Sequence, residues 1–150
     1  MSSPNAPNGR GSSLDGTKTV IVVNDDLPAG LVANAAAVLA LTLGRRIDGL
    51  IGPDLKDASG QVHAGITTVP LPVLRANDGV LRRIRDEAGG NGGALLIVDF
   101  TDAAQQTRTY DEYTRRLAGT AGDDLSYLGV ALHGPAKVVN RFTGSLPLVR

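Results

Sequence analysis

Three side chains of this sequence follow apolar runs and could transfer protons. Asp99 and Thr101 stand at the end of the run ALLIVDF (94–100), and His133 directly follows the run 125–132. A carboxylate can act as a general base, and the ordinary pKa of His lies close to physiological pH. We therefore predict Asp99, Thr101 and His133 as catalytic candidates. A helix cap at the first two and a hydrogen-bonded turn at the third are the alternatives.

An amide and two acids mark a second segment of chemical interest. Asn34 interrupts the alanine-rich run 31–43. An amide there costs helix propensity and burial energy unless it finds a partner, which could be a ligand or a neighbouring loop. Asp25 and Asp26 precede the run, and both could simply cap a helix that begins there.

Two threonines and a glutamine complete the predicted binding groups. Thr67 and Thr68 could donate hydroxyls to a site, although Thr is also a common strand residue. Gln105 would reach the same site as Asp99 if a helix begins directly after that strand. The predicted substrate-binding residues are Asp26, Asn34, Thr67, Thr68 and Gln105.

The composition narrows the chemistry further. The chain has no Cys, which excludes disulfides, thiolate nucleophiles and Cys-based metal sites. With only two His, His63 and His133, a zinc site would need carboxylates, and we predict neither a metal nor a cofactor. Fifteen basic residues balance fifteen acidic ones, which argues against a nucleic-acid partner and favours a small-molecule ligand. No P-loop or G-x-S-x-G motif occurs.

Two stretches bear on location. Residues 1–16 are rich in Ser, Gly, Pro and Asn without a signal-type apolar run, and we expect a disordered tail there. Leu27–Leu43 is the longest apolar stretch, but Pro28, Gly30 and Asn34 interrupt it, whereas a spanning helix needs about 20 uninterrupted residues. The sequence therefore predicts a core helix, no membrane contact and a cytoplasmic protein.

Residues 17–150 are expected to form one domain of alternating strands and helices. Aliphatic and β-branched runs predict strands at 18–23, 94–100 and 125–132. The run 65–74 is expected at a sheet edge because Pro70 and Pro72 lack a ladder donor. Helices are predicted at 31–43, 78–88, 103–118 and 136–142. This order indicates an α/β fold, a three-layer α/β/α sandwich with a mixed, mainly parallel central sheet.

In such sheets ligands bind beyond the carboxyl ends of the strands. The groups Asn24–Asp26, Asp99–Asp102 and His133 all follow predicted strand ends. Because the ends of parallel strands meet at one edge, we expect Asn34, Asp99 and His133 to share a single hollow.

Several segments resemble known families. VVNDDLPAG with its alanine-rich helix, the strand ending Val98-Asp99, and the closing LGVALHGPAKVVNRFTGSLPL resemble type 2 peptidyl-tRNA hydrolases. DLPAGLVANAAAVL, GITTVPLPVL, VDFTDAAQ and TGSLPL resemble more closely a bacterial family catalogued as domain of unknown function 2000, over residues 18–150. The resemblance implies a peptidyl-tRNA hydrolase 2-like fold.

The chain departs from the hydrolase pattern at one informative place. The hydrolases carry a lysine implicated in catalysis between the loop glycine and the helix, whereas Gly30 here is followed directly by Leu31-Val32-Ala33. Asp99 matches their strand-end Asp, and Thr101 stands near their catalytic Thr. Without the lysine no group is evident to hold a phosphate or polarise an ester carbonyl, which argues against peptidyl-tRNA as substrate.

Two hypotheses of different kinds remain, with peptidyl-tRNA hydrolysis as a weaker third. The first is a small-molecule hydrolase of an amide or ester, with Asp99 and His133 as the acid–base pair. The second is a non-catalytic ligand-binding or interaction module on the same scaffold, which the missing lysine favours. The sequence leaves the substrate and the oligomeric state open, and the apolar edge Val69–Leu74 is consistent with a homodimer.

Overall fold

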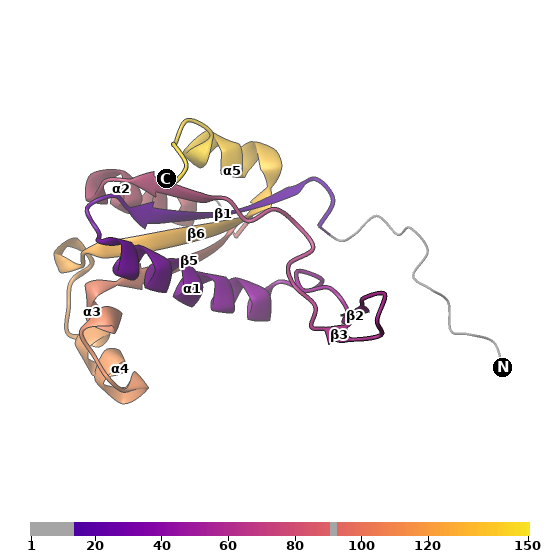
Figure 1. The fold of residues 1–150 in the computed structure, drawn as a ribbon. Helices are drawn as coiled ribbons and strands as arrows, with labels where there is room; N and C mark the ends of the chain where they lie inside the picture. Colours follow the sequence, from indigo (N-terminus) through magenta and orange to yellow (C-terminus); the bar gives the residue numbers. More distant parts are fainter. Residues whose placement is uncertain (1–13, 91–92) are drawn as a thin grey trace.

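Four strands form the central sheet, in the order β4-β1-β6-β5 (Figure 1). They are β1 (Thr17–Asn24), β4 (Val73–Ala76), β5 (Leu96–Thr101) and β6 (Tyr127–Pro135) in a computed structural model that describes residues 14–90 and 93–150. β1 pairs in parallel with β4, whereas β6 lies antiparallel between β1 and β5. The expected mixed sheet is confirmed, but the expectation of mainly parallel pairing is wrong because β6 runs against both of its neighbours.

Helices cover both faces of this sheet (Figure 1). α1 (Ala29–Arg46) lies on one face, and α2 (Asp78–Gly89) and α5 (Ala136–Thr143) lie on the other. Successive strand side chains point to opposite faces. In β1, Ile21 and Val23 therefore pack with α1, while Val20 and Val22 pack with the other two helices. This arrangement gives two apolar cores and three layers.

α1 differs from the helix predicted for residues 31–43. Its N-cap is Pro28, no side chain caps it, and it continues through Gly44 to Arg46. Asp25 and Asp26 are exposed and make no cap, so that prediction is wrong. Only Ala35, Leu39 and Leu43 of this helix are buried, and Asn34 lies on its exposed side.

The single helix predicted for residues 103–118 is two helices, α3 (Asp102–Gln105) and α4 (Tyr110–Ala118). The hydroxyl of Thr107 donates to the carbonyl of Ala103 at 3.0 Å and helps to end α3. The hydroxyl of Thr109 then accepts from the Glu112 backbone N–H at 3.1 Å and begins α4. The Glu112 carboxylate accepts in return from the Arg108 N–H at 3.0 Å. This T-x-x-E sequence is a helix-start signal, and it explains the break.

Two segments project from or border the sheet. β2 (Leu55–Lys56) and β3 (Val62–His63) form a hairpin that extends past the C-terminal end of α1 (Figure 1). At the outer edge of β4, Leu74 bridges Leu148, and the Val149 N–H donates to the carbonyl of Val73 at 2.9 Å. β4 is thus an edge strand of the sheet, as the prolines of 65–74 predicted, and the C-terminal segment covers this edge.

The domain begins a little earlier than predicted. Leu14 is buried in the α1-side core, and the Thr17 N–H donates to its carbonyl at 3.0 Å. Residues 1–13 of the predicted tail 1–16, and residues 91–92, lie outside the described residues. A short 3-10 helix, Gly122–Asp124, precedes β6. No helix within the described ranges is long and apolar enough to cross a membrane.

Substitution of Gly129 is expected to destabilise the protein. A Cβ at this position would stand 2.9 Å from Leu39 Cδ1 and 3.0 Å from the Val22 carbonyl oxygen, so α1 would have to move away from the sheet. Gly129→Ala should lower the free energy of unfolding by about 1–3 kcal/mol, as is typical of overpacked cores. Urea unfolding measures this, with Gly122→Ala as the control because nothing lies within 4 Å of its added Cβ. Equal stabilities of the two variants would contradict the close packing.

Candidate functional site

The predicted site residues divide between the two ends of the sheet. β1, β4 and β5 run in one direction and end at Asn24, Ala76 and Thr101. His133 stands opposite Thr19 and Leu96, near the beginnings of β1 and β5. Because β6 is antiparallel, its carboxyl end lies at the far end of the sheet from Asp99 and Thr101. The expectation of one hollow shared by Asn34, Asp99 and His133 is therefore wrong.

His133 is held by a local partner. Its Nδ1 lies 2.8 Å from the hydroxyl of Thr19, and the ring borders a shallow hollow with Arg46 and Asp48. Burial lowers the pKa of His133 below its ordinary value. The hydrogen bond resembles the alternative that the sequence left open, but His133 lies within β6 and not in a turn.

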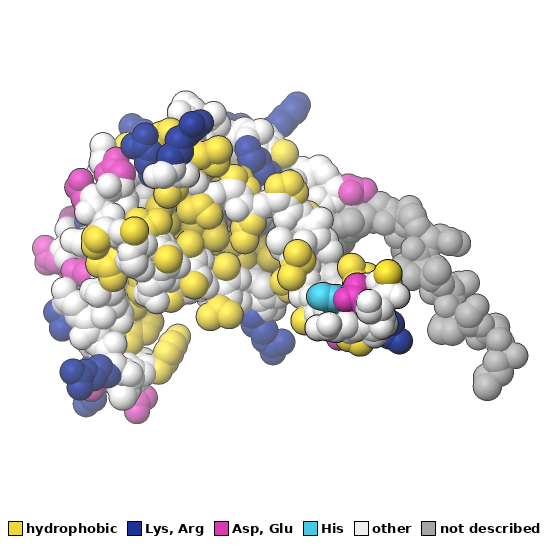
Figure 2. Space-filling model, in the orientation of Figure 1, with side chains coloured by type: hydrophobic (Ala, Val, Ile, Leu, Met, Phe, Trp, Pro, Cys, Tyr) yellow, Lys and Arg dark blue, Asp and Glu magenta, His cyan; other side chains and the backbone are white. Residues whose placement is uncertain are grey.

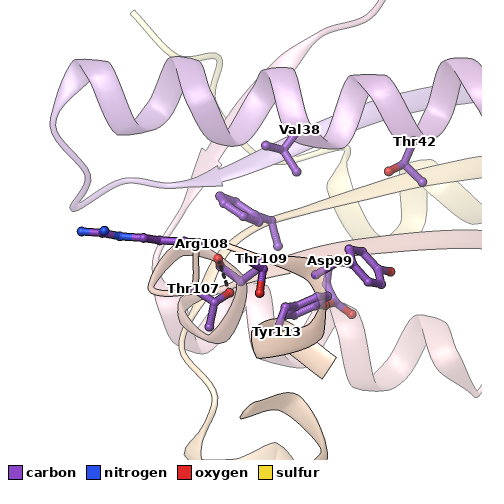
Figure 3. A pocket seen from close by; sticks show the side chains of 10 residues that line it. Val38, Thr42, Asp99, Thr107, Arg108, Thr109 and Tyr113 are labelled. Carbon is purple, nitrogen blue, oxygen red and sulfur yellow. Dashed lines mark hydrogen bonds between the residues drawn. The ribbon is translucent and has the colours of Figure 1, made fainter. Parts of the chain in front are cut away.

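Asp99 lines a pocket of about 330 Å³ between α1 and the α3–α4 segment (Figure 3). Its carboxylate accepts from Nε of Arg85 at 2.9 Å. Burial and, after it, the charge of Asp99 raise the pKa of Tyr113, which lines the same pocket. The hydroxyls of Thr107 and Thr109 are occupied by the backbone bonds that separate α3 from α4. Much of the polar lining of this pocket therefore serves the fold.

The remaining predicted residues are scattered. Asn34, Gln105 and Asp26 are exposed. The hydroxyls of Thr67 and Thr68 donate to the carbonyls of Val69 at 2.9 Å and Gly49 at 2.8 Å, and so hold the segment after the hairpin. Thr101 is 1% exposed, and its hydroxyl has no hydrogen-bond partner among the described residues.

A second pocket, of about 470 Å³, opens where β1 and β4 end beside the start of α1. We call it the strand-end pocket. Its apolar wall is formed mainly by Val23, Leu27, Val32, Ala33 and Val149. Its polar groups are Asn24, Asp25, Arg75 and Arg150.

The cations of the strand-end pocket are available to a ligand. The side chains of Arg75 and Arg150 make no hydrogen bond or ion pair with the described residues. α1 begins beside them with no side-chain cap and no acid in its first turn, so its positive end is also unneutralised from within the helix. Asp25 is the one acidic side chain of the lining, whereas both ends of the Asn24 amide are used, by the Tyr127 carbonyl and the Asp26 N–H.

Neither arginine of this pocket was predicted from the sequence. Arg75 lies on β4 and Arg150 in the C-terminal segment, and they meet because that segment pairs with β4. The C-terminal segment and β4 are far apart in the sequence, and no local motif predicts their pairing. The only available signal was the likeness of the TGSLPL segment to a family tail, which does not tell where the tail lies.

Metal chemistry finds no support among the described residues. No group of three or more His, Asp and Glu side chains that could hold a metal ion occurs in residues 14–90 and 93–150.

Comparison with known proteins agrees with this α/β architecture. The chain belongs to the family described as protein of unknown function DUF2000, whose model matches residues 17–150, as the resemblance predicted. It is similar to the solved structure of Atu0240, a protein of unknown function from Agrobacterium tumefaciens strain C58, with a TM-score of 0.82. At 20% identity over 90% of this chain and 98% of that one, the likeness shows the fold alone. No curated protein matches the chain. The likeness to type 2 peptidyl-tRNA hydrolases stays a prediction.

His133 is expected to make stability depend on pH. Because burial lowers its pKa, the unfolded chain binds the proton more readily than the folded protein between the two pKa values. Stability should therefore fall as pH drops below the ordinary His value, and His133→Gln should remove this part of the slope. Urea unfolding between about pH 5 and pH 8 tests it. Parallel curves for the variant and the parent would contradict a buried, neutral His133.

Replacing Thr101 by Val tests whether its buried hydroxyl lacks a hydrogen-bond partner. The hydroxyl is buried without a partner, and an unsatisfied buried polar group costs about 1–3 kcal/mol. Thr101→Val keeps the shape, so we expect the free energy of unfolding to stay equal or to rise by up to about 1 kcal/mol. Thermal and urea unfolding measure it, and Thr143→Val is the control because that buried hydroxyl donates to the Val139 carbonyl at 2.8 Å. Destabilisation of both variants alike would show that Thr101 has a partner.

Proposed function

We propose that the protein binds a small organic anion with a hydrocarbon part in the strand-end pocket, and that it does so without catalysing a reaction. The observation that carries this proposal is the pair of unpartnered guanidinium groups, Arg75 and Arg150, beside an apolar wall. A carboxylate or phosphate fits such a site because charge-assisted hydrogen bonds to Arg are strong. The uncapped start of α1 adds N–H groups that favour the same charge.

The lining of this pocket supports binding better than catalysis. It contains no Ser, Thr, Tyr, His or Lys side chain, and the chain has no Cys. A nucleophile or a proton relay would have to come from Asp25 alone, with no second group to orient it. Hydrolysis of an amide or ester stays a prediction. Asp99 faces Val130 and His133 faces Leu96, so the two side chains stand three residue pairs apart on neighbouring strands, about 10 Å, too far to act directly as its acid–base pair. Peptidyl-tRNA hydrolysis is also disfavoured, because this chain has no lysine directly after Gly30, where those hydrolases carry theirs.

The ligand class is tested with simple probes. Hexanoate and hexyl phosphate are expected to bind with measurable heat by titration calorimetry, 1-hexanol more weakly, and hexylamine not at all. Arg75→Gln should weaken the binding of hexanoate about tenfold or more, since a hydrogen bond to a charged group contributes about 1.5–3 kcal/mol. Arg83→Gln, an exposed arginine of α2, is the matched control and should leave the affinity unchanged.

Two outcomes would overturn the proposal. One is binding of hexanoate that Arg75→Gln and Arg83→Gln affect alike, because the site would then lie elsewhere. The other is equal affinity for hexanoate and hexylamine, because the guanidinium groups would then play no part. The melting temperature should rise as the hexanoate concentration is increased, which provides an independent measure of binding to the folded state.

A further inference from the structure

The exposed side of α1 is apolar over most of its length. Buried Ala35, Leu39 and Leu43 define the side that faces the sheet. The opposite side presents Ala33, Ala37 and Leu41, and Leu41 is 76% exposed. Hydrophobic side chains gather over this helix and continue onto the hairpin (Figure 2). A solvated helix normally carries charged and polar residues on its exposed side. An exposed side as apolar as this one is typical of an interaction surface.

Large aliphatic side chains extend this surface past the end of α1. Ile51 lies against Gly44 of the helix and is 53% exposed, and Ile66 beside it is 77% exposed. On the hairpin, Leu55 and Val62 are 66% and 55% exposed. Because Leu55 pairs with His63 and Val62 with Lys56, the two side chains lie on opposite faces of the hairpin. We call the α1 side together with Ile51, Ile66 and one face of the hairpin the α1 face. Its two ends differ in charge, since exposed Asp25 and Asp26 precede the helix and Arg45 lies in its last turn.

We propose that the α1 face binds a second copy of the chain, with the two α1 helices antiparallel about a two-fold axis at Ala37. In this arrangement each contact occurs twice, as a two-fold interface requires. Leu41 of one chain lies over the small Ala33 of the other, where there is room for it. Arg45 lies beside the start of the partner's helix, within reach of its two aspartates. Charge and shape therefore favour this direction of pairing, because parallel helices would place like ends together.

The area also argues for a second copy rather than a short peptide. A stable interface buries about 800 Å² on each partner, more than one side of an 18-residue helix provides. The hairpin supplies the remainder. It projects beyond the C-terminal end of α1 (Figure 1), which in an antiparallel pair lies next to the N-terminal end of the partner's helix.

The pairing would bring the hairpin to the partner's strand-end pocket. That pocket opens at the N-terminal end of α1, beside the end of β4, whereas the hairpin lies beyond the C-terminal end of α1 (Figure 1). The hairpin carries His63, whose Nε2 lies 2.8 Å from the Asp57 carboxylate. In the dimer each chain would thus cover the ligand site of the other with a polar pair. This last consequence rests on the proposed function, whereas the dimer does not.

Oligomeric state and helix contact are tested together. Sedimentation at about 100 µM should give a dimer for the parent, well above the micromolar Kd of a modest interface. Ala37→Arg should give a monomer with an unchanged circular dichroism spectrum, while Ala118→Arg, an exposed alanine of α4, should remain dimeric. Since the chain has no Cys, Ala37→Cys can be oxidised cleanly and should form a disulfide-linked dimer, whereas Ala118→Cys should not.

Charge exchange tests the direction of the helices. The double variant Asp25→Lys/Asp26→Lys and the single variant Arg45→Glu should each dimerise at least tenfold more weakly than the parent. Mixed together they should form a heterodimer, because each carries the charge that the other now needs. A monomeric parent, a dimer that Ala37→Arg leaves intact, or a mixture that stays as weak as its components would each overturn the proposal. Arg75→Gln should weaken hexanoate binding while the protein stays dimeric, because this substitution changes the ligand site alone.

Discussion

The antiparallel insertion of β6 between β1 and β5 is the constraint on which the rest of this molecule depends. Val130, Ala131 and Leu132 are completely buried, and β6 serves both cores at once. Gly129 on the same strand lets α1 approach the sheet closely. With β6 fixed in this direction, the carboxyl ends of β1, β4 and β5 gather at one edge and that of β6 lies at the other. This geometry sets which of the predicted site residues can lie close together.

Local signals predicted much of the fold, and long-range pairing accounts for what they missed. The run TVIVV predicted β1, and the helix predicted at 78–88 is α2, which Asn77 caps by accepting from the Val80 N–H at 2.9 Å. The direction of β6 could not be predicted, because a buried aliphatic run has the same composition in either direction. The break between α3 and α4 was within reach, since Thr109 and Glu112 form a recognisable helix start.

The candidate site was harder to predict than the fold for a related reason. Asn34 appeared buried because alanine occupies both sides of α1, and only Leu39 and Leu43 with their spacing of four indicate the inner side. Arg75 and Arg150 are far apart in sequence, and only the pairing of the C-terminal segment with β4 brings them to one pocket. A charged residue on an edge strand ordinarily protects that edge, so neither arginine stood out.

The two proposals meet in α1, because the helix would carry a ligand at its start and a partner along its exposed side. Asp25 and Asp26 do not cap α1. In the proposed dimer they would instead pair with Arg45 of the partner subunit, which would approach them there. If the partner's hairpin covers the strand-end pocket, the ligand binds the dimer more tightly than the monomer. Linkage then requires that the ligand strengthen dimerisation by the same factor, since the two free energies belong to one cycle. In this way, binding of the ligand in the strand-end pocket would shift the chain from monomer to dimer.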